Sequence, residues 1–186
     1  MVAYADKAIG QIVARLEQSG VRDNTLIIFT GDNGTDKPIV TPWNGTKVVG
    51  GKGTMSDTGT RVPLIASWPS GIQKPGRVAN DLVEFTDMFP PLCEVTGAKL
   101  PKDHPNDGAS IAPILKNKAE TRTKDWIYIW YRKQVMVRNK QYSLVANQDG
   151  TGAALTRYKG SFDGKQLNDD KLTKLSLIHI SEPTRR

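Results

Sequence analysis

The sequence predicts an α/β fold followed by a small antiparallel β subdomain. An amphipathic stretch at residues 3–20 is followed, after a short polar connection, by an apolar run at 25–29. A helix followed by a strand is typical of layered α/β folds. A second apolar run at 62–68 supplies another strand. Beyond residue 124, short apolar or alternating runs separated by two-residue polar turns predict an antiparallel meander, with strands at 127–131, 134–138 and 141–146.

The first predicted element is a helix from Ala3 to Gly20. Its apolar residues recur at helical spacing and form one stripe, made by Ala8, Ile9, Ile12, Val13 and Leu16. Gly20 is the residue type expected just past a helix C-terminus.

The strand Thr25–Phe29 is apolar and bounded by turn residues, which predicts a buried strand. It is followed by Gly31, Asp32, Asn33 and Gly34. Open α/β sheets bind their ligands at the carboxyl ends of strands, and carboxylate and amide oxygens suit a hard cation such as Ca²⁺ or Mg²⁺. On these residues alone a plain turn is the favoured interpretation, because Asn-Gly is also the commonest hairpin-turn dipeptide.

The segment from Asp36 to Gly51 has no clear period and contains prolines and glycines, which predicts a long surface loop. Lys52 follows between Gly51 and Gly53, so its ammonium can approach an anion without neighbouring side chains in the way. An exposed lysine in a flexible loop is the alternative. In the next strand, Pro63 favours an edge position or a strand start.

A helix is predicted from about Asp87 to Gly97, with Thr86 as its cap and Asp87 at its positive end. Prolines in the first turns of this helix destabilise it little, because the N–H groups that they lack would have no partner within the helix. Cys93 falls on the apolar face of this helix, which predicts a buried thiol. A short helical turn is expected at 111–115.

We place a subdomain boundary in the charged stretch 116–124. This gives an α/β domain over residues 1–115 and a β subdomain over 116–174, in which the chain beyond Asn147 has no clear assignment. Residues 175–186 resemble the translation of a sequencing adaptor and are excluded from the fold. His104 lies alone in a polar loop, and we expect it to be solvated.

The composition narrows the class of protein. The formal net charge of +7 favours anionic partners, but no compact Lys/Arg cluster with interleaved aromatic residues indicates nucleic-acid binding. No apolar run approaches the ~20 residues of a membrane helix. The single cysteine excludes an internal disulfide and a zinc site built from cysteines.

Four elements in a fixed order resemble the C-terminal part of a type I sulfatase, a family of the alkaline-phosphatase-like superfamily. The resemblance covers most of the chain from Tyr4 to about Tyr142, and the pair formed by Asp32-Asn33-Gly34 and Gly51-Lys52-Gly53-Thr54 is its most specific part. The four elements are Asp6, residues 24–34, residues 51–65, and residues 86–97 with 107–110.

The resemblance implies roles for three residues. Asp32 and Asn33 match the positions that ligate an active-site calcium, and Lys52 matches the lysine that holds the sulfate group of the substrate. In such enzymes a Cys or Ser converted to formylglycine attacks sulfur. The resemblance also implies an alkaline-phosphatase-like sheet with flanking helices, a sulfated carbohydrate or aryl sulfate as substrate, and a periplasmic or extracellular location.

The departures from the family pattern are informative. Residues 1–174 contain no nucleophile motif of the form Cys/Ser-x-Pro/Ala-x-Arg, so we expect a fragment that is inactive by itself. Asp57 and Thr58 stand where many members have Glu-Gly, so the family pattern does not predict how this loop contacts the substrate. A phosphodiesterase or phosphatase of the same superfamily and a non-catalytic basic module that binds acidic glycans are the alternatives.

Overall fold

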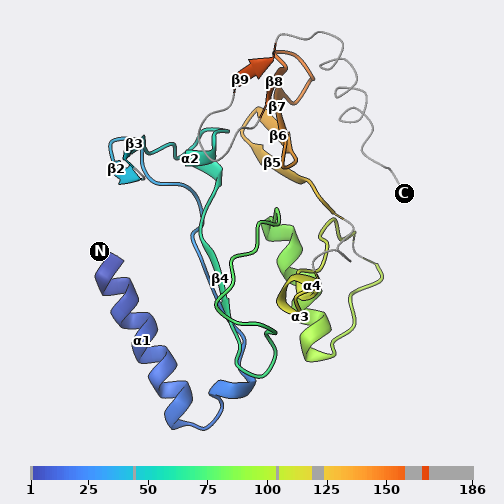
Figure 1. The fold of residues 1–186 in the computed structure, drawn as a ribbon. Helices are drawn as coiled ribbons and strands as arrows, with labels where there is room; N and C mark the ends of the chain where they lie inside the picture. The colour runs from blue at the N-terminus through green and yellow to red at the C-terminus, as the bar shows by residue number, and fades with distance from the viewer. Residues whose placement is uncertain (1, 44, 104, 119–123, 158–164, 168–186) are drawn as a thin grey trace.

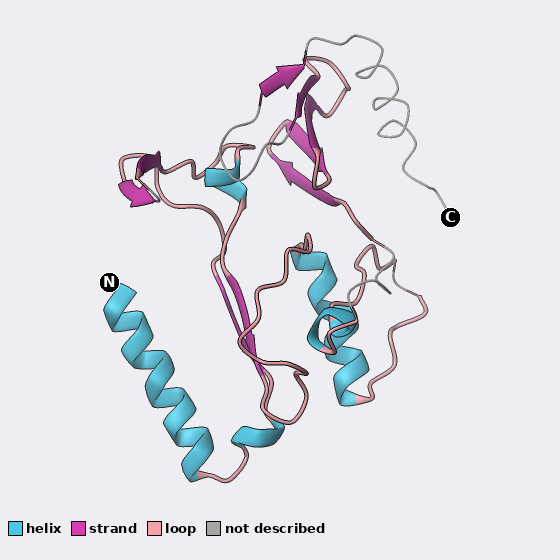
Figure 2. Ribbon diagram, in the orientation of Figure 1, coloured by secondary structure: helices cyan, strands magenta, loops and turns pink. Residues whose placement is uncertain are grey.

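The computed structural model describes residues 2–43, 45–103, 105–118, 124–157 and 165–167. Helices and strands are mixed, and the strands form three separate antiparallel sheets (Figures 1 and 2). The fold class is thus confirmed, including the antiparallel sheet in the C-terminal part. The tail 175–186, His104 and part of the 116–124 boundary lie outside the described residues.

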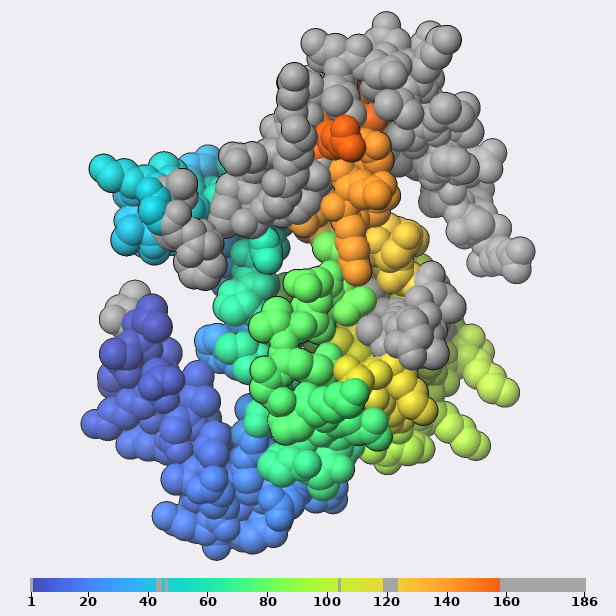
Figure 3. All heavy atoms as spheres, in the orientation of Figure 1, coloured from blue at the N-terminus to red at the C-terminus, as the bar shows by residue number. Residues whose placement is uncertain are grey.

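Helix α1 (Val2–Gln18) matches the predicted first helix and is followed by the short helix η1 (Arg22–Asn24). Gly20 adopts a positive φ of 69° just after α1, as expected for a C-terminal glycine. No residue of α1 is buried, and Ile12 on its apolar stripe is 59% exposed. Figure 3 shows α1 at the blue end of the molecule, opposite the orange C-terminal sheet. No helix within the described part of the chain is long and apolar enough to cross a membrane.

Strand β1 (Ile27–Thr30) pairs antiparallel with β4 (Leu64–Ser67). It begins two residues later than predicted, because Thr25 caps η1 and its hydroxyl donates to the Val21 carbonyl at 2.7 Å. The prediction of a buried strand is wrong: Phe29 is 38% exposed, since β4 is the only sheet partner of β1 among the described residues. Pro63 immediately precedes β4, which confirms its place at a strand start.

Strands β2 (Val40–Trp43) and β3 (Thr46–Val49) form a hairpin inside the segment predicted to be a long loop. That prediction is therefore wrong. The connecting residues are Asn44 and Gly45, the dipeptide most typical of a two-residue hairpin turn. Gly45 adopts a φ of +79°, whereas Asn44 lies outside the described residues.

Helices η2 (Phe85–Met88), α3 (Phe89–Thr96) and α4 (Ala112–Leu115) follow. Thr86 does not cap this helical segment, contrary to the prediction. Instead, the completely buried Asp87 carboxylate accepts hydrogen bonds from the backbone N–H groups of Glu84 (2.9 Å) and Ala109 (2.8 Å). The expected end of α3 is confirmed by Gly97, with a φ of +73°, and Cys93 is buried as predicted.

A buried charge cluster connects the helices to the C-terminal sheet. Lys124 is 7% exposed, and its ammonium lies 3.2 Å from Asp87 Oδ1 and forms an ion pair with Glu84. It also donates to the Asp107 carbonyl and lies 4.7 Å from the centre of the Trp126 ring. The backbone N–H of Tyr128 donates to the other Glu84 oxygen at 2.6 Å. These contacts fix the start of the sheet against η2.

The C-terminal sheet has the order β5-β6-β7-β8-β9 and is antiparallel throughout. The three predicted strands are confirmed, with β7 starting one residue later than expected. Strands β8 and β9 lie beyond Asn147, where no element was predicted. The bounds are β5 (Ile127–Tyr131), β6 (Gln134–Arg138), β7 (Tyr142–Asn147), β8 (Ala154–Arg157) and β9 (Lys165–Leu167).

The buried hydrophobic side chains come from the helical segment and from the C-terminal sheet. They lie in α3, in residues 111–115 and in strands β5 to β8, and Met136 is the largest that is fully buried. In the β7–β8 turn, hydrogen bonds from the Thr151 hydroxyl (2.7 Å) and backbone N–H (3.0 Å) lower the pKa of the Asp149 carboxyl.

Candidate functional site

Asp32 and Asn33 lie directly after β1, where the strand gives way to a bend. Asp32 is exposed and Asn33 is half-buried. One carboxylate oxygen of Asp32 accepts the backbone N–H of Asn33 at 2.9 Å, which fixes the turn. The two side chains thus offer a charged and a neutral oxygen donor at the end of a strand.

The loop that carries Lys52 leaves the β2–β3 hairpin and returns to the segment that follows β1. Gly50 donates its N–H to the Ile39 carbonyl at 2.8 Å, and Lys52 donates its N–H to the Thr35 carbonyl at 3.0 Å. The Lys52 side chain is exposed. Among the described residues no ion pair involves its ammonium, so it is available to an anion.

The short helix α2 (Asp57–Thr60) joins the two loops. Gly34 donates its N–H to the Gly59 carbonyl at 2.9 Å. A Cβ atom on Gly34 would overlap the Thr58 carbonyl, and one on Gly59 would overlap the Gly51 carbonyl. The backbones meet at distances that only glycine permits. The structure therefore brings the backbone that carries Asp32 and Asn33 beside the backbone that carries Lys52, as Figure 1 shows around α2.

Asp57 anchors this junction to the C-terminal sheet. Its carboxylate lies 2.5 Å from Arg138 Nη1 on β6, and both side chains are nearly buried. A second, longer pair of 4.0 Å joins Asp57 to the exposed Arg61 one turn later. Arg138 was missed by sequence reasoning, because 81 residues separate it from Asp57 and no local pattern indicates the pairing. The Asp57 position, left open by the sequence, thus has a structural partner.

The donors at the end of β1 fit part of a calcium site. Calcium takes about six to eight oxygen ligands, including carboxylates and amide carbonyls, and the side chains of Asp32 and Asn33 are of these types. No group of three or more His, Cys, Asp or Glu side chains suitable for a metal occurs in the part of the chain that the structure describes. These two residues can therefore supply only a fraction of the ligands, and their metal role stays a prediction.

The nucleophile motif is absent from residues 1–174, and the described residues supply no replacement. Cys93 is buried in α3 and is followed by Glu94, which does not fit the motif. The letters of the motif occur once in the whole sequence, at Ser181–Arg185. Those residues belong to the adaptor-like tail and lie outside the described residues.

Comparison with known proteins identifies the protein family to which the chain belongs. Residues 1–98 match the family model described as Sulfatase, which covers both Asp32-Asn33 and Lys52. The chain therefore belongs to the sulfatase family, as its motifs predicted.

Two curated relatives are sulfatases. The chain is 32% identical over 145 residues to the Ulvan-active sulfatase of Formosa agariphila, an alignment covering 73% of this chain and 26% of the relative. It is 32% identical over 133 residues to the steryl-sulfatase of Mus musculus, covering 68% and 21%. The chain thus spans about a quarter of the length of these relatives.

The structural neighbours have the same fold. A phosphonate monoester hydrolase from Silicibacter pomeroyi matches with a TM-score of 0.69, covering 95% of this chain and 37% of that one, at 22% identity. At this identity the likeness establishes the fold alone. It includes the C-terminal sheet, since nearly the whole of this chain is aligned.

Proposed function

We propose that the chain is part of a sulfatase that hydrolyses a sulfate ester of a carbohydrate or an aryl alcohol. One observation carries the proposal: the Lys52–Thr35 and Gly34–Gly59 backbone hydrogen bonds hold the backbone of an exposed, glycine-flanked lysine next to a strand end with two oxygen donors. Family membership supports the same reaction class. A location outside the cytoplasm is part of this proposal and rests on the family resemblance.

Lys52 binds the non-bridging oxygens of the sulfate group in this proposal. Its ammonium is a compact charge with three donors, and the absence of side chains on Gly51 and Gly53 leaves it accessible. Positive charge held at this point stabilises the negative charge that shifts within the sulfate group as the S–O bond breaks. The nucleophile, proposed to be formylglycine, is supplied by none of the described residues.

Asp32 and Asn33 hold a calcium ion in this proposal, together with ligands from elsewhere. When bound, calcium offsets the charge of the sulfate group as a Lewis acid. Asp32 contributes one negative charge and Asn33 none, so these two ligands leave the ion with net positive charge toward the substrate. The Asn33 N–H bond to Asp32 fixes the first carboxylate oxygen and favours the second one for the metal.

The first test is anion binding by the 186-residue chain. Inorganic sulfate titrated in the presence of CaCl₂ is expected to shift the amide NMR signals of Gly51 and Gly53. Lys52→Ala is expected to weaken this binding about tenfold, as for the loss of one charge-assisted contact. Sulfate binding by the unaltered chain is expected to be stronger with calcium than without it, and Asp32→Asn is expected to remove this difference.

Lys47→Ala is the matched control, because Lys47 is an exposed lysine on the neighbouring strand β3. It should leave the titration unchanged. Equal effects of the two lysine substitutions would mean non-specific attraction to a basic chain and would contradict the proposed role of Lys52. If the unaltered chain bound sulfate equally well without calcium, the proposed calcium-binding role of Asp32 would be contradicted. The alternative of a non-catalytic module that binds acidic glycans would then be favoured.

A second test addresses the reaction. The chain alone is expected to show no turnover of a chromogenic aryl sulfate, and measurable turnover would contradict this. Genomic sequence on either side of residues 1–174 is expected to encode a Cys/Ser-x-Pro/Ala-x-Arg motif with paired aspartates. A Thr or Ser nucleophile within a two-metal His/Asp pattern would instead assign the protein to the phosphoesterases.

A further inference from the structure

The end of the β5–β6 hairpin lies against the Lys52 loop. The position of a Cβ atom on Gly53 is 3.5 Å from Tyr131 Oη and 3.7 Å from Tyr131 Cε1. The Asp57–Arg138 ion pair fixes the same hairpin to α2, and Figure 1 shows α2 beside β5 and β6. Tyr131 is therefore a direct neighbour of the residue that follows Lys52.

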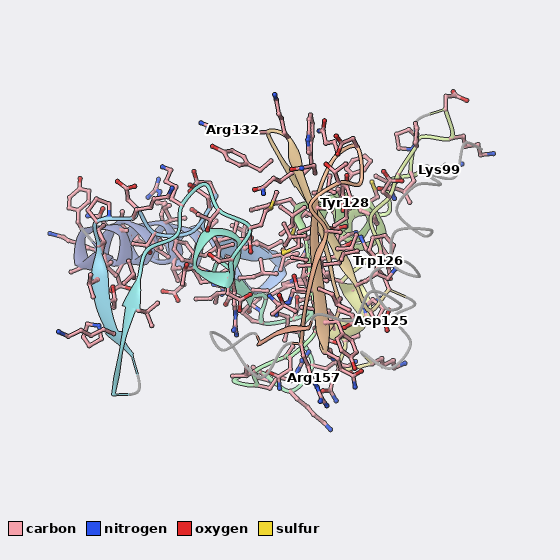
Figure 4. The ribbon with its side chains drawn as sticks, turned by 90° about the horizontal axis from the view of Figure 1, so that it is seen from above. Lys99, Asp125, Trp126, Tyr128, Arg132 and Arg157 are labelled. Atoms are coloured by element: carbon pink, nitrogen blue, oxygen red, sulfur yellow. The ribbon has the colours of Figure 1, made fainter. Side chains whose placement is uncertain are left out.

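Arg132 is held in a defined position beside Tyr131. Its guanidinium carbon lies 5.3 Å from the centre of the Tyr131 ring, a cation–π distance. Its carbonyl accepts hydrogen bonds from Trp130 Nε1 at 2.8 Å and Gln148 Nε2 at 3.1 Å. Figure 4 shows Arg132 at the hairpin end of the sheet, away from Arg157, with Tyr128 further along β5 and Trp126 just before this strand.

The backbone of Arg132 is unfavourable for arginine. It is the first residue of a two-residue turn, since Tyr131 pairs with Gln134, and its φ is +56°. At such a position glycine is preferred and other residues are strained. An arginine that costs stability at an exposed turn points to a role for its side chain.

We infer that Tyr131 and Arg132 form a subsite for a sulfated glycan, next to the sulfate held by Lys52. Tyr131 is 43% exposed and offers a sugar ring the part of its aromatic surface that the Arg132 guanidinium does not cover. The Arg132 guanidinium is a planar fork that matches a carboxylate or a second sulfate. The inference rests on the proposed function and narrows its substrate from any sulfate ester to a polyanionic carbohydrate.

The test uses the 186-residue chain and two probes: a heparin-derived tetrasaccharide, which has several anionic groups, and 4-nitrophenyl sulfate, which has one. Affinities are measured by calorimetry at fixed salt concentration. Arg132→Ala is expected to weaken tetrasaccharide binding about tenfold, since charge-assisted bidentate contacts are among the strong hydrogen bonds. The same substitution is expected to leave 4-nitrophenyl sulfate binding unchanged.

Lys133→Ala is the matched control, because Lys133 has the same charge and lies in the same exposed turn. It is expected to change tetrasaccharide affinity less than twofold. Arg132→Gly separates binding from folding. It should weaken tetrasaccharide binding as much as Arg132→Ala does. It should also raise the melting temperature by about 2–4 °C, because glycine relieves the strained backbone.

Three results would overturn the inference: no binding of the tetrasaccharide by the unaltered chain, equal effects of Arg132→Ala and Lys133→Ala, or equal effects of Arg132→Ala on both probes. Lys52→Ala separates the inference from the proposed function. If it affects neither probe while Arg132→Ala still weakens the tetrasaccharide, the sulfate-binding role of Lys52 fails and the glycan subsite stands.

Discussion

Replacing Lys124 with alanine is expected to lower the free energy of unfolding by about 3–5 kcal/mol, the range for breaking a buried ion pair. Lys124 lies within hydrogen-bonding distance of two carboxylates, Glu84 and Asp87, of which Asp87 is fully buried. Without the ammonium, two negative charges remain close together away from water. Chemical denaturation followed by circular dichroism measures the change.

Lys116→Ala provides the control. Lys116 forms a 3.3 Å ion pair with Glu94, in which both side chains are about half exposed, and such surface pairs contribute about 0–1 kcal/mol. A double variant, Lys124→Met with Asp87→Asn, should recover part of the loss because it removes opposite charges together. If Lys124→Ala and Lys116→Ala have equal effects, the cluster is not the link between helices and sheet that its geometry indicates.

Replacing Gly34 with alanine is expected to separate the two loops of the candidate site. The added methyl group would overlap the Thr58 carbonyl and the neighbouring Gly59, so the Gly34–Gly59 hydrogen bond cannot keep its length. Overpacking typically costs about 1–3 kcal/mol, and here the obstructing atoms are backbone. Amide hydrogen exchange at Gly59 and Lys52 is expected to accelerate, and sulfate binding to be lost.

Gly10→Ala is the matched substitution. Gly10 lies within α1, and an added Cβ there meets no atom within 4 Å. It should stabilise the helix by about 0.5–1 kcal/mol and leave exchange at Gly59 unchanged. Unaltered sulfate binding in Gly34→Ala would show that the two loops act independently.

Elements governed by neighbouring residues could be predicted from the sequence. The periodicity of α1 and its glycine stop, the end of α3 at Gly97, and the alternation in β5 to β7 all depend on residues within a few positions of one another. The two glycine-flanked motifs also identified the family. The β2–β3 hairpin was missed because Pro42 interrupts a four-residue strand and masks its alternation, although Asn44-Gly45 carried the turn signal.

The remaining contacts depend on pairs that are distant in the sequence. Lys124 is 37 residues from Asp87 and 40 from Glu84, and Arg138 is 81 residues from Asp57. Spacing within one element does not reveal such pairs. The role assigned to Thr86 failed because the cap lies two residues earlier: Glu84 and Asp87 form a reciprocal capping box around η2. Ala109 and Lys124, from later elements, add contacts to Asp87 that local spacing does not reveal.

The uneven distribution of the core affects how the chain would meet a protease. In the part of the chain that the structure describes, the buried apolar side chains lie between Pro90 and Leu155, whereas Asp32 and Lys52 lie before this stretch. Segments with few buried contacts open at the lowest cost, so cleavage would begin around these loops and spare the strands from β5 to β8. An anion that binds only when these loops are folded stabilises the folded loops. A ligand of this site would therefore also protect the chain from digestion.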